Sequence, residues 1–600
     1  MKAHMKKTAY LLILLLAGSV FAGCDDLLDA VPKDKMSPET FFKNEKELQA
    51  FSMNLYEMLS APFIEDADTY IQMGLTDEMK GTRQIPASAG DGSWSWGSLR
   101  NVNTLLEYLP NCSDAASRTQ YEALARFFRA YFYFNKVKRF GDVPWYDKPV
   151  GSADTEALNR PRDSREFILG KMIEDIDFAI ANLPSTKSAY EITKWTAMAL
   201  KSRFLLFEGT FRKYHTEFDY GAGAHDFKWY LDECAAVSEE FISSSGYGVH
   251  TAGGANKAYY ALFTTQNATD NMDEVILARD YNVTYNVTHA ANATMLSGTR
   301  GRRGMTRKLV ASYLMADGSR FTDQQGWETM DFLTETQNRD PRLSQTIRTP
   351  GYTRIGDKKP EAPNFLSCMT GYHPIKYVME KEKDATGSDV DLIIFRSAEV
   401  LLNYAEAKAE AGTLAQADLD RSVNKLRDRV GLPHLNLEAA NADPDPFLTD
   451  AEWGGYQNVT GANKGVILEI RRERAVELAQ EGFRYYDIIR WKEGKIFEKQ
   501  YYGMYFPGPG EYDLNADGIP DLLLYTEETA PASTAPARYK LGSVDFILSG
   551  GTSGNVNPYK ELKCRWDDGK DYLYPIPTDE RNLTGGILTQ NPGWNDGLTF

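Results

Sequence analysis

Apolar residues recur at helical spacing in the first third of the chain. Leu48, Phe51 and Leu55 fall on one stripe, which predicts an amphipathic helix over 37–59. The stretch 121–140 is apolar on most sides, which predicts a buried helix, and the glycine that follows it is a typical helix end. Further helices are predicted over 99–109, 164–183 and 193–211.

The helical spacing fades from about 215 to 390, where Gly, Asn, Thr and Tyr become frequent. This region is predicted to hold loops and short strands. Helical spacing then returns over 395–411, 421–430 and 465–491, before a loop-rich tail. Short connections between amphipathic helices favour antiparallel pairs. The prediction is a mainly α fold, a tetratricopeptide-like superhelix of helical pairs with an inserted loop-rich, short-strand region, although a repeat of roughly 34 residues is not evident.

The N-terminus combines three lysines within its first seven residues, an apolar run over 9–22 and a cysteine at position 24. The run is shorter than the roughly 20 residues that span a bilayer, so the pattern indicates a secretory signal peptide. Its end resembles the lipobox of bacterial lipoproteins, in which Cys24 would be acylated and become the anchored first residue. The following Asp25 and Asp26 resemble an acidic signal for export to the cell surface. The alternative is an ordinary signal peptide with a chance cysteine.

Charge and cysteine content narrow the function classes. Removal of residues 1–23 takes away three lysines and moves the formal net charge from −17 to −20. A chain with this much negative charge repels the phosphate backbone of nucleic acids. Nucleic acid is therefore not expected as a partner. Four cysteines remain, and their spacing leaves both disulfides and buried free thiols open. They are Cys112, Cys234, Cys368 and Cys564.

Several sequence blocks occur in a fixed order from the first third to the C-terminus. They include RAYFYF with FGDVP at 129–144, the AEVLLNYAEA helix at 395–412, VNKLRDRVGLP at 423–433, the block at 467–491 and YPIP with QNPGW at 574–594. Together with WGSLRNVNTLLEYL at 96–109 and NRDPRLSQTI at 338–347, this set resembles the SusD/RagB family. The resemblance covers the whole chain after the signal peptide.

The resemblance implies a surface lipoprotein of the Gram-negative outer membrane. Such a protein sits on a SusC-like, TonB-dependent transporter and captures oligosaccharides, or sometimes peptides, for import. It is not an enzyme and requires no cofactor. On this basis 24–600 is expected to form one compact unit. The expected parts are a signal peptide at 1–23, a tether at 24–36, a helical region at 37–214, a loop-rich insertion at 215–390, helices at 391–492 and a loop-rich tail at 493–600.

Ligand-binding residues are expected outside the shared blocks. Sugars need flat aromatic faces and side chains that hydrogen-bond to hydroxyls, and the loop from 75 to 98 offers both. Core packing is the alternative for its tryptophans. Tyrosines alternate with polar residues over 278–295, where a solvated hairpin is the alternative. The resulting candidates are Asp77, Arg83, Trp94, Trp96, Tyr281 and Tyr285, with Trp327 as a weaker one.

The segment DLNADGIPD at 513–521 matches part of a calcium-binding loop. Asp513, Asn515, Asp517 and Asp521 stand at positions 1, 3, 5 and 9, and a glycine stands at the tight turn. Leu524 replaces the bidentate glutamate at position 12, which weakens the match. An Asx-turn without metal is the alternative.

Two other interpretations of function stay open. A lipid-anchored glycoside hydrolase would need two carboxylates held together, such as Glu473 and Glu477. These alternate with arginines on an apolar helix, so paired structural charges are favoured. The second interpretation is a scaffold that closes the transporter without contacting the ligand itself.

Overall fold

The computed structural model describes residues 40–59, 71–80 and 92–594. This part of the chain is mainly helical, with strands confined to small sheets of two or three. The expected mainly α fold is therefore confirmed. No helix of the described part is both long and apolar enough to cross a membrane.

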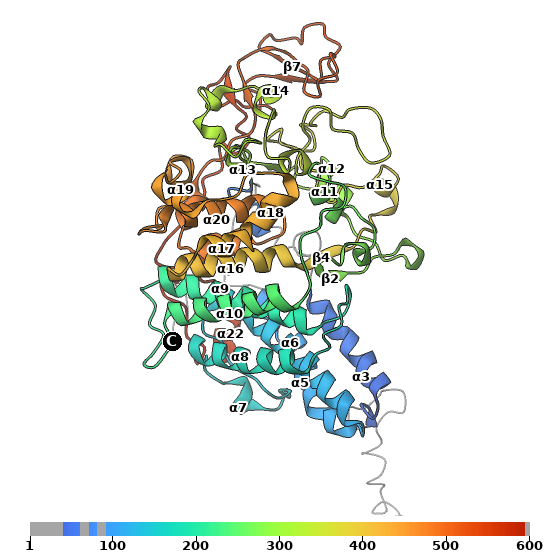
Figure 1. Ribbon diagram of the computed structural model, residues 1–600, viewed down its shortest axis with the longest axis vertical. Coiled ribbons are helices and arrows are strands. Elements are labelled where there is room, and N and C mark those ends of the chain that lie inside the picture. Colours follow the sequence, from blue (N-terminus) through green and yellow to red (C-terminus); the bar gives the residue numbers. More distant parts are fainter. Residues whose placement is uncertain (1–39, 60–70, 81–91, 595–600) are drawn as a thin grey trace, which may run out of the picture.

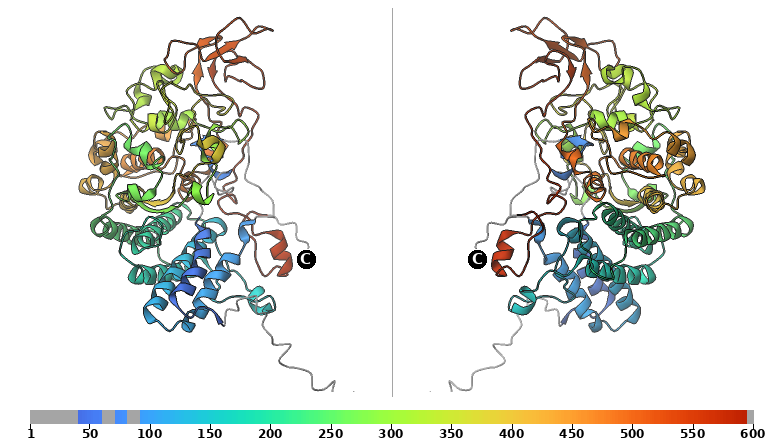
Figure 2. Two further views of the ribbon diagram at one scale, coloured as in Figure 1. Left: turned by 90° about the vertical axis from the view of Figure 1, so that its right-hand side faces the viewer. Right: turned by 90° about the vertical axis from the view of Figure 1, so that its left-hand side faces the viewer.

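Long helices pack one after another in chain order through the lower half of the molecule (Figure 1). Each contacts the next, and the series continues from the fifth helix directly to helices of the C-terminal half. The side views in Figure 2 show these helices curving around one face. The series comprises α5 (Gly97–Tyr108), α6 (Ala115–Phe140), α8 (Arg165–Asn182), α9 (Lys194–Tyr214), α10 (Phe227–Ser244), α16 (Ser397–Ala411) and α20 (Lys464–Glu477).

Helix α6 lies at the centre of the N-terminal half, as its apolar sequence predicts. Asp114 caps its start by accepting from the Ser117 amide, and the helix ends at Gly141 with a φ of 73°. A β-carbon at Gly141 would lie 3.0 Å from a methyl group of Leu573. The helix end is thus packed directly against the C-terminal segment, and glycine suits both the positive φ and the close contact.

Two helix boundaries differ from the prediction. The first helix of the described part, α3 (Glu45–Ser52), starts at the Asn44 cap, which accepts from the Glu47 amide. The predicted helix over 465–491 is two helices, α20 and α21 (Arg484–Arg490). Gln480 and Gly482 have φ values of 65° and 83°. These left-handed conformations interrupt the helical path between α20 and α21.

The range predicted as loop-rich contains α10, an 18-residue helix that packs on α9 and α16. Its buried side chains include Tyr230, Cys234, Val237 and Phe241, which follow helical spacing. The remainder of this range fits the prediction, because it holds short helices and short strands. Strand β2 (Val275–Arg279) pairs with β4 (Leu392–Arg396), and β3 (Gly304–Met305) pairs with β1 (Met79–Lys80).

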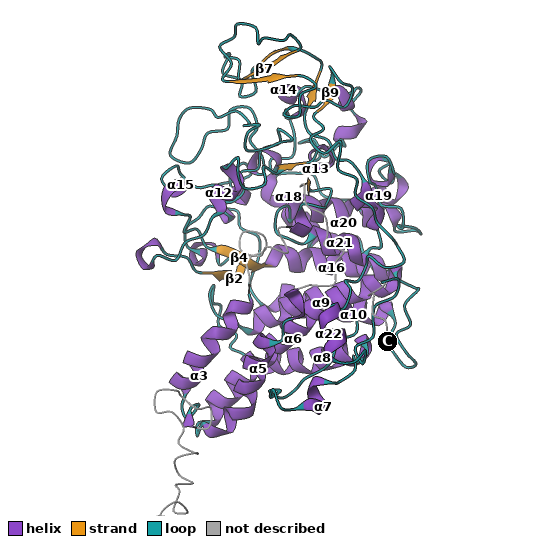
Figure 3. Ribbon diagram, turned by 180° about the vertical axis from the view of Figure 1, so that it is seen from behind, coloured by secondary structure: helices purple, strands orange, loops and turns teal. Residues whose placement is uncertain are grey.

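The tail runs to the far end of the molecule and then returns. At the far end, β6 (Gly510–Tyr512), β7 (Leu522–Tyr525) and β8 (Ala537–Lys540) form a small sheet. The chain then comes back to α6 and forms α22 (Thr578–Leu583), which Figure 3 shows from behind. The Tyr574 amide donates to the Arg139 carbonyl over 2.8 Å, and the Asn591 amide group donates to the Phe140 carbonyl over 2.9 Å.

The charged residues of α20 form the paired network that its sequence predicts. Glu477 contacts Arg396 at 2.7 Å and Arg342 at 3.0 Å, and it also pairs with Arg429. Glu473 pairs with Arg342 and lies 3.1 Å from Arg427. All these side chains are buried. Both carboxylates are therefore neutralised by several guanidinium groups, which lower their pKa values and leave no acid–base pair.

All four cysteines of the described part are free thiols. Cys112, Cys234 and Cys368 are buried, and burial raises the pKa of Cys234 to about 12 and that of Cys368 to about 11. Cys564 is half-buried. Of the two alternatives left open by the sequence, the structure has free thiols.

Candidate functional site

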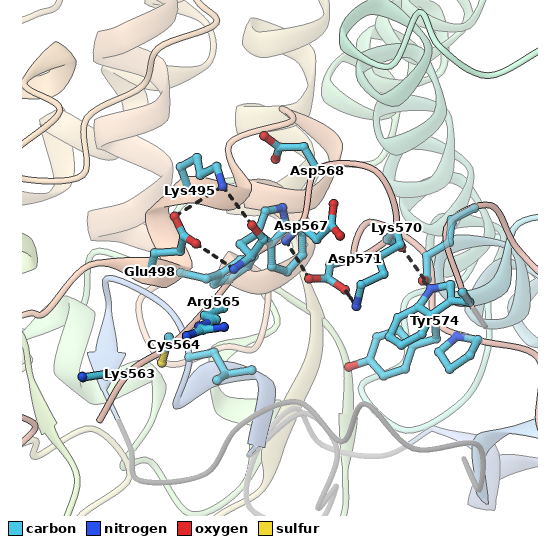
Figure 4. Close-up of a pocket in the computed structure, with 16 residues that line it drawn as sticks. Lys495, Glu498, Lys563, Cys564, Arg565, Asp567, Asp568, Lys570, Asp571 and Tyr574 are labelled. Atoms are coloured by element: carbon cyan, nitrogen blue, oxygen red, sulfur yellow. Dashed lines mark hydrogen bonds and ion pairs between the residues drawn. The ribbon is translucent and has the colours of Figure 1, made fainter. Parts of the chain in front are cut away.

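A groove of about 1050 Å³ opens beside the returning tail (Figure 4). Its volume is at the upper end of ligand pockets, which typically span about 300–1000 Å³. We call it the tail groove. Its lining residues are Leu75, Lys495, Phe497, Glu498, Lys563, Cys564, Arg565, Trp566, Asp567, Asp568, Lys570, Asp571, Leu573, Tyr574, Pro575 and Trp594.

Aromatic side chains form the inner wall of the tail groove. The Phe497 and Trp566 rings lie 4.7 Å apart between centroids, and Trp566 packs on Tyr572 at 5.1 Å. A β-carbon on Gly494 would lie only 1.8 Å from the indole nitrogen of Trp566. Glycine at this position therefore lets the indole ring reach its place in the wall.

Tyr574 connects the groove to the N-terminal half. Its ring lies under the Arg139 guanidinium at 4.0 Å, and its hydroxyl accepts from Gln72 over 3.2 Å. The same Gln72 amide group lies 3.5 Å from the Tyr486 hydroxyl. These contacts hold the tyrosine ring in one orientation at the edge of the groove.

Trp594 also lines the tail groove, next to the segment that carries Tyr574. Its indole N–H donates to the carbonyl of Leu573 over 2.9 Å and to that of Lys570 over 3.1 Å. The Lys570 ammonium lies 4.1 Å from the ring centroid. The ring is half-buried, so it keeps an accessible face.

Basic and acidic side chains line the tail groove in equal numbers. Four are basic and four acidic, and most are exposed. Arg565, Asp567 and Asp568 are exposed. Lys495 is exposed as well, donates to the Trp566 carbonyl over 2.8 Å and lies 3.4 Å from Glu498. The mouth thus offers both donors and acceptors without a net charge, as Figure 4 shows.

The predicted ligand residue Asp77 is part of the buried framework instead. Its side chain is only 3% exposed, and both carboxylate oxygens accept from the Arg484 guanidinium, over 2.7 and 2.6 Å. This partner holds the pKa of Asp77 below its usual value despite burial. The carboxylate has no free face for a ligand. Arg83 and Cys24 lie outside the described residues.

The two predicted tryptophans lie away from the tail groove. Trp94 is buried and packs edge-on against Phe140 at 4.9 Å, which matches the core alternative. Trp96 is half-buried and packs against Phe132 and Tyr146 at 5.5 and 5.3 Å. Both line a separate small pocket.

The predicted tyrosine pair divides between core and surface. Tyr281 is buried against His289, with ring centroids 4.6 Å apart. Tyr285 is 78% exposed at the tip of a turn, next to Asn286 with a φ of 57°. The weaker candidate Trp327 is buried against Trp453. None of the described ligand candidates lines the tail groove, so the structure does not assemble them into one site.

The 513–521 loop forms a tight acidic turn. Asp513 accepts from the Ala516 and Gly518 amides, each over 2.7 Å, and Asp521 accepts from the Leu514 amide over 2.8 Å. Burial raises the pKa of Asp521, and the charges of Asp517 and Asp513 add to the rise. Among the described residues, no cluster of three or more His, Cys, Asp or Glu has metal-binding geometry. The backbone contacts match the Asx-turn alternative, and calcium binding stays a prediction.

The predicted ligand residues do not include the segment that lines much of the tail groove. Residues 563–571 read KCRWDDGKD and lie directly before the YPIP block. They combine an aromatic ring with charged side chains that can hydrogen-bond to sugar hydroxyls. The same combination indicated a binding site in the loop from 75 to 98. That signal was available, but only the fold shows that the segment lies against Phe497 and Trp594.

Two family profiles match this chain. A profile described as the SusD family matches residues 266–594, more than half of the chain. The chain belongs to the SusD family. A second profile, described as starch-binding associating with outer membrane, matches residues 93–206. The second description names binding, and neither names a catalytic activity.

Relatives of this SusD-family chain match along most of their length. SusD-like protein P38 of Formosa agariphila is 22% identical over 526 residues, which cover 81% of this chain and 91% of the relative. SusD-like protein P2 of the same species is 23% identical over 511 residues, covering 82% and 92%. The family assignment therefore extends over most of the chain.

Solved structures share the fold. A SusD-like carbohydrate-binding protein of Bacteroides fragilis superposes with a TM-score of 0.67 at 22% identity, covering 91% of this chain and 99% of that one. Another structure, described with xylogluco-oligosaccharide, gives a TM-score of 0.55 at 16% identity, covering 91% and 99%. The helical series is thus that of the SusD-like proteins, whose fold is tetratricopeptide-like.

Proposed function

We propose that this protein binds an oligosaccharide in the tail groove and delivers it to a SusC-like, TonB-dependent transporter. Membership of the SusD family supports a binding role. The related fold described with xylogluco-oligosaccharide supports a glycan as the cargo. The observation that carries the proposal is the groove itself, where aromatic rings and balanced hydrogen-bonding groups line a volume sufficient for several sugar units.

The groove chemistry suits a neutral glycan. Apolar faces of sugar rings stack on aromatic side chains, and the half-buried Trp594 ring offers such a surface. Exposed Arg565, Asp567 and Asp568 supply donors and acceptors for hydroxyl groups. Because acidic and basic lining residues are equal in number, the groove provides no net attraction for a charged sugar.

A glycan array followed by calorimetry tests the groove. We expect one class of neutral oligosaccharide to bind, and the double variant Arg565→Ala, Asp567→Ala to bind it at least about tenfold more weakly, a loss of ~1.4 kcal/mol. Asp579→Ala is the matched control, since Asp579 is exposed on α22 and does not line the groove. Unchanged affinity in the double variant would remove the tail groove from the proposal.

The cysteine pattern provides a second test of occupancy. Cys564 lines the groove and is half-buried, whereas the other three described cysteines are buried. A thiol reagent is therefore expected to modify Cys564 first in the folded protein. Bound oligosaccharide should slow this modification, and Cys564→Ser should abolish it. Equal rates with and without the array ligand would show that the glycan binds elsewhere.

Anchoring at the cell surface belongs to the same proposal. Acylation of Cys24 would hold the protein in the outer membrane next to its transporter. Metabolic labelling with a fatty acid should mark the wild type but not Cys24→Ser, and protease added to intact cells should degrade the labelled protein. Fractionation of the wild type with the cytosol would contradict this location.

The competing functions predict different results. A glycoside hydrolase would release products from the glycan that the array identifies, whereas a binding protein leaves it intact. A peptide carrier would bind peptides in the same groove and no glycan. A pure scaffold would bind the transporter with neither ligand. Product analysis and calorimetry with both ligand classes separate the four cases.

A further inference from the structure

A second, smaller pocket lies on the other side of the C-terminal segment. Its volume is about 140 Å³, well below that of the tail groove. We call it the α5 pocket, because Trp96, Leu99 and Asn103 at the start of α5 contribute to it. Residues near α22 close the opposite wall. A space of this size takes one small ring rather than a chain.

The walls of the α5 pocket are aromatic and apolar. Trp96 and Tyr146 meet at 88° with centroids 5.3 Å apart, which forms a right-angled corner. Both rings are half-buried, so each keeps an accessible part. Leu158, 44% exposed, stands at the mouth. A flat ring with one apolar face fits such a corner.

Asn103 holds the segment that carries Tyr146 and Lys148 against α5. The Asn103 side chain is 1% exposed, and its N–H groups donate to the carbonyls of Tyr146 and Lys148 over 3.0 and 3.2 Å. Its Oδ1 atom is buried and has no hydrogen-bond partner within the described part of the chain.

We infer that the α5 pocket is a second sugar-binding site, which takes a single neutral pyranose. One apolar face of the sugar packs in the corner of Trp96 and Tyr146. Exposed Arg100 and Lys148 at the rim contact the outer hydroxyls. The inference rests on the proposed glycan-binding function, but it uses residues separate from the tail groove.

Saturation-transfer NMR with free glucose, galactose, mannose and xylose tests the α5 pocket. We expect at least one sugar to bind the wild type and to bind Leu158→Trp at least about tenfold more weakly, because the larger ring blocks the mouth. Leu583→Trp is the matched control, since Leu583 is 79% exposed and does not line the pocket. Circular dichroism confirms that both variants are folded.

The groove double variant separates this inference from the proposed function. It should bind the monosaccharide like the wild type while losing the oligosaccharide. Absence of monosaccharide binding to the wild type, or equal binding to Leu158→Trp, overturns the α5 pocket alone if the oligosaccharide still binds the tail groove. Loss of all glycan binding in the wild type overturns both.

Discussion

Glu477 shows how one side chain joins distant segments of the C-terminal half of the chain. It lies on α20, yet its partners come from three other segments, at Arg342, Arg396 and Arg429. None of these four side chains is more than 2% exposed. A buried charge in this setting requires all of its partners.

Substitution of Glu477 should therefore be severe. We expect Glu477→Gln to lower the free energy of unfolding by about 3–5 kcal/mol, because three buried guanidinium groups lose their shared carboxylate. Urea unfolding followed by fluorescence measures the change. Glu438→Gln is the control, because Glu438 is exposed on α19 (Leu437–Ala442). A loss as small as that of the control would show that the network adds little stability.

Glu78 should give the opposite pH dependence from a typical carboxylate. Burial raises its pKa to about 7, although the Gln480 amide donates to it. The folded state therefore keeps a proton that the unfolded state releases between pH ~4.5 and pH ~7. This group's contribution is largest below pH ~4.5 and declines as the pH rises to ~7.

The variant Glu78→Gln isolates this effect. We expect the wild type to lose stability relative to the variant as the pH rises from about 4.5 to about 7, since glutamine cannot ionise. Parallel thermal melts across this range measure the difference. A constant difference between the two proteins would mean that Glu78 has the same pKa in the folded and unfolded chains.

Individual residues were the hardest level to predict from the sequence. Asp77 resembles a surface ligand group in its loop, but its partner Arg484 lies 407 positions later. Trp94 likewise becomes a core residue through contact with the ring of Phe140, 46 positions later, and Tyr281 packs against His289. Local composition shows which side chains have binding chemistry, whereas the fold decides which of them face solvent.

Among the elements, helices were predicted well wherever their apolar stripe was long. The predictions for α6 and α16 include their terminal glycines, Gly141 and Gly412, both with positive φ. Helix α10 was missed although Tyr230, Cys234 and Phe241 keep helical spacing, because glycine-rich stretches on both sides obscured it. The break before α21 depends on Gln480, which has no strong turn preference of its own.

The 513–521 loop carries a prediction at the same scale. We expect calcium to bind with a Kd of about 10⁻⁴–10⁻³ M, because Leu524 on β7 replaces the bidentate ligand. Calorimetric titration with CaCl₂ measures it, and Asp517→Ala should abolish the heat of binding. Asp545→Ala, an exposed acidic site in the same tail, should bind like the wild type. An equal signal in both variants would favour the Asx-turn without metal.

At the scale of the whole molecule, the fold class followed from the sequence and the groove did not. The tail groove draws its lining from position 75, from 495–498 and from 563–594, which meet only because the tail returns to α6. No periodicity encodes that return. The order of helices and the family blocks, by contrast, are readable along the chain.

The balanced groove predicts a weak effect of salt. We expect the affinity for a neutral oligosaccharide to change less than about twofold between roughly 50 and 500 mM NaCl, although the whole chain is acidic. Calorimetry at several salt concentrations measures this. A steep decline would indicate a charged ligand held by Arg565 and its basic neighbours.

The return of the tail also bears on biosynthesis. The tail groove lacks Tyr574 and Trp594 until the last part of the polypeptide has been synthesised. Chains truncated during translation would retain most of the helical stack yet have no complete receptor surface. Under the proposed function, competence to bind an oligosaccharide would thus be acquired at the very end of synthesis, and incomplete copies would not compete for ligand.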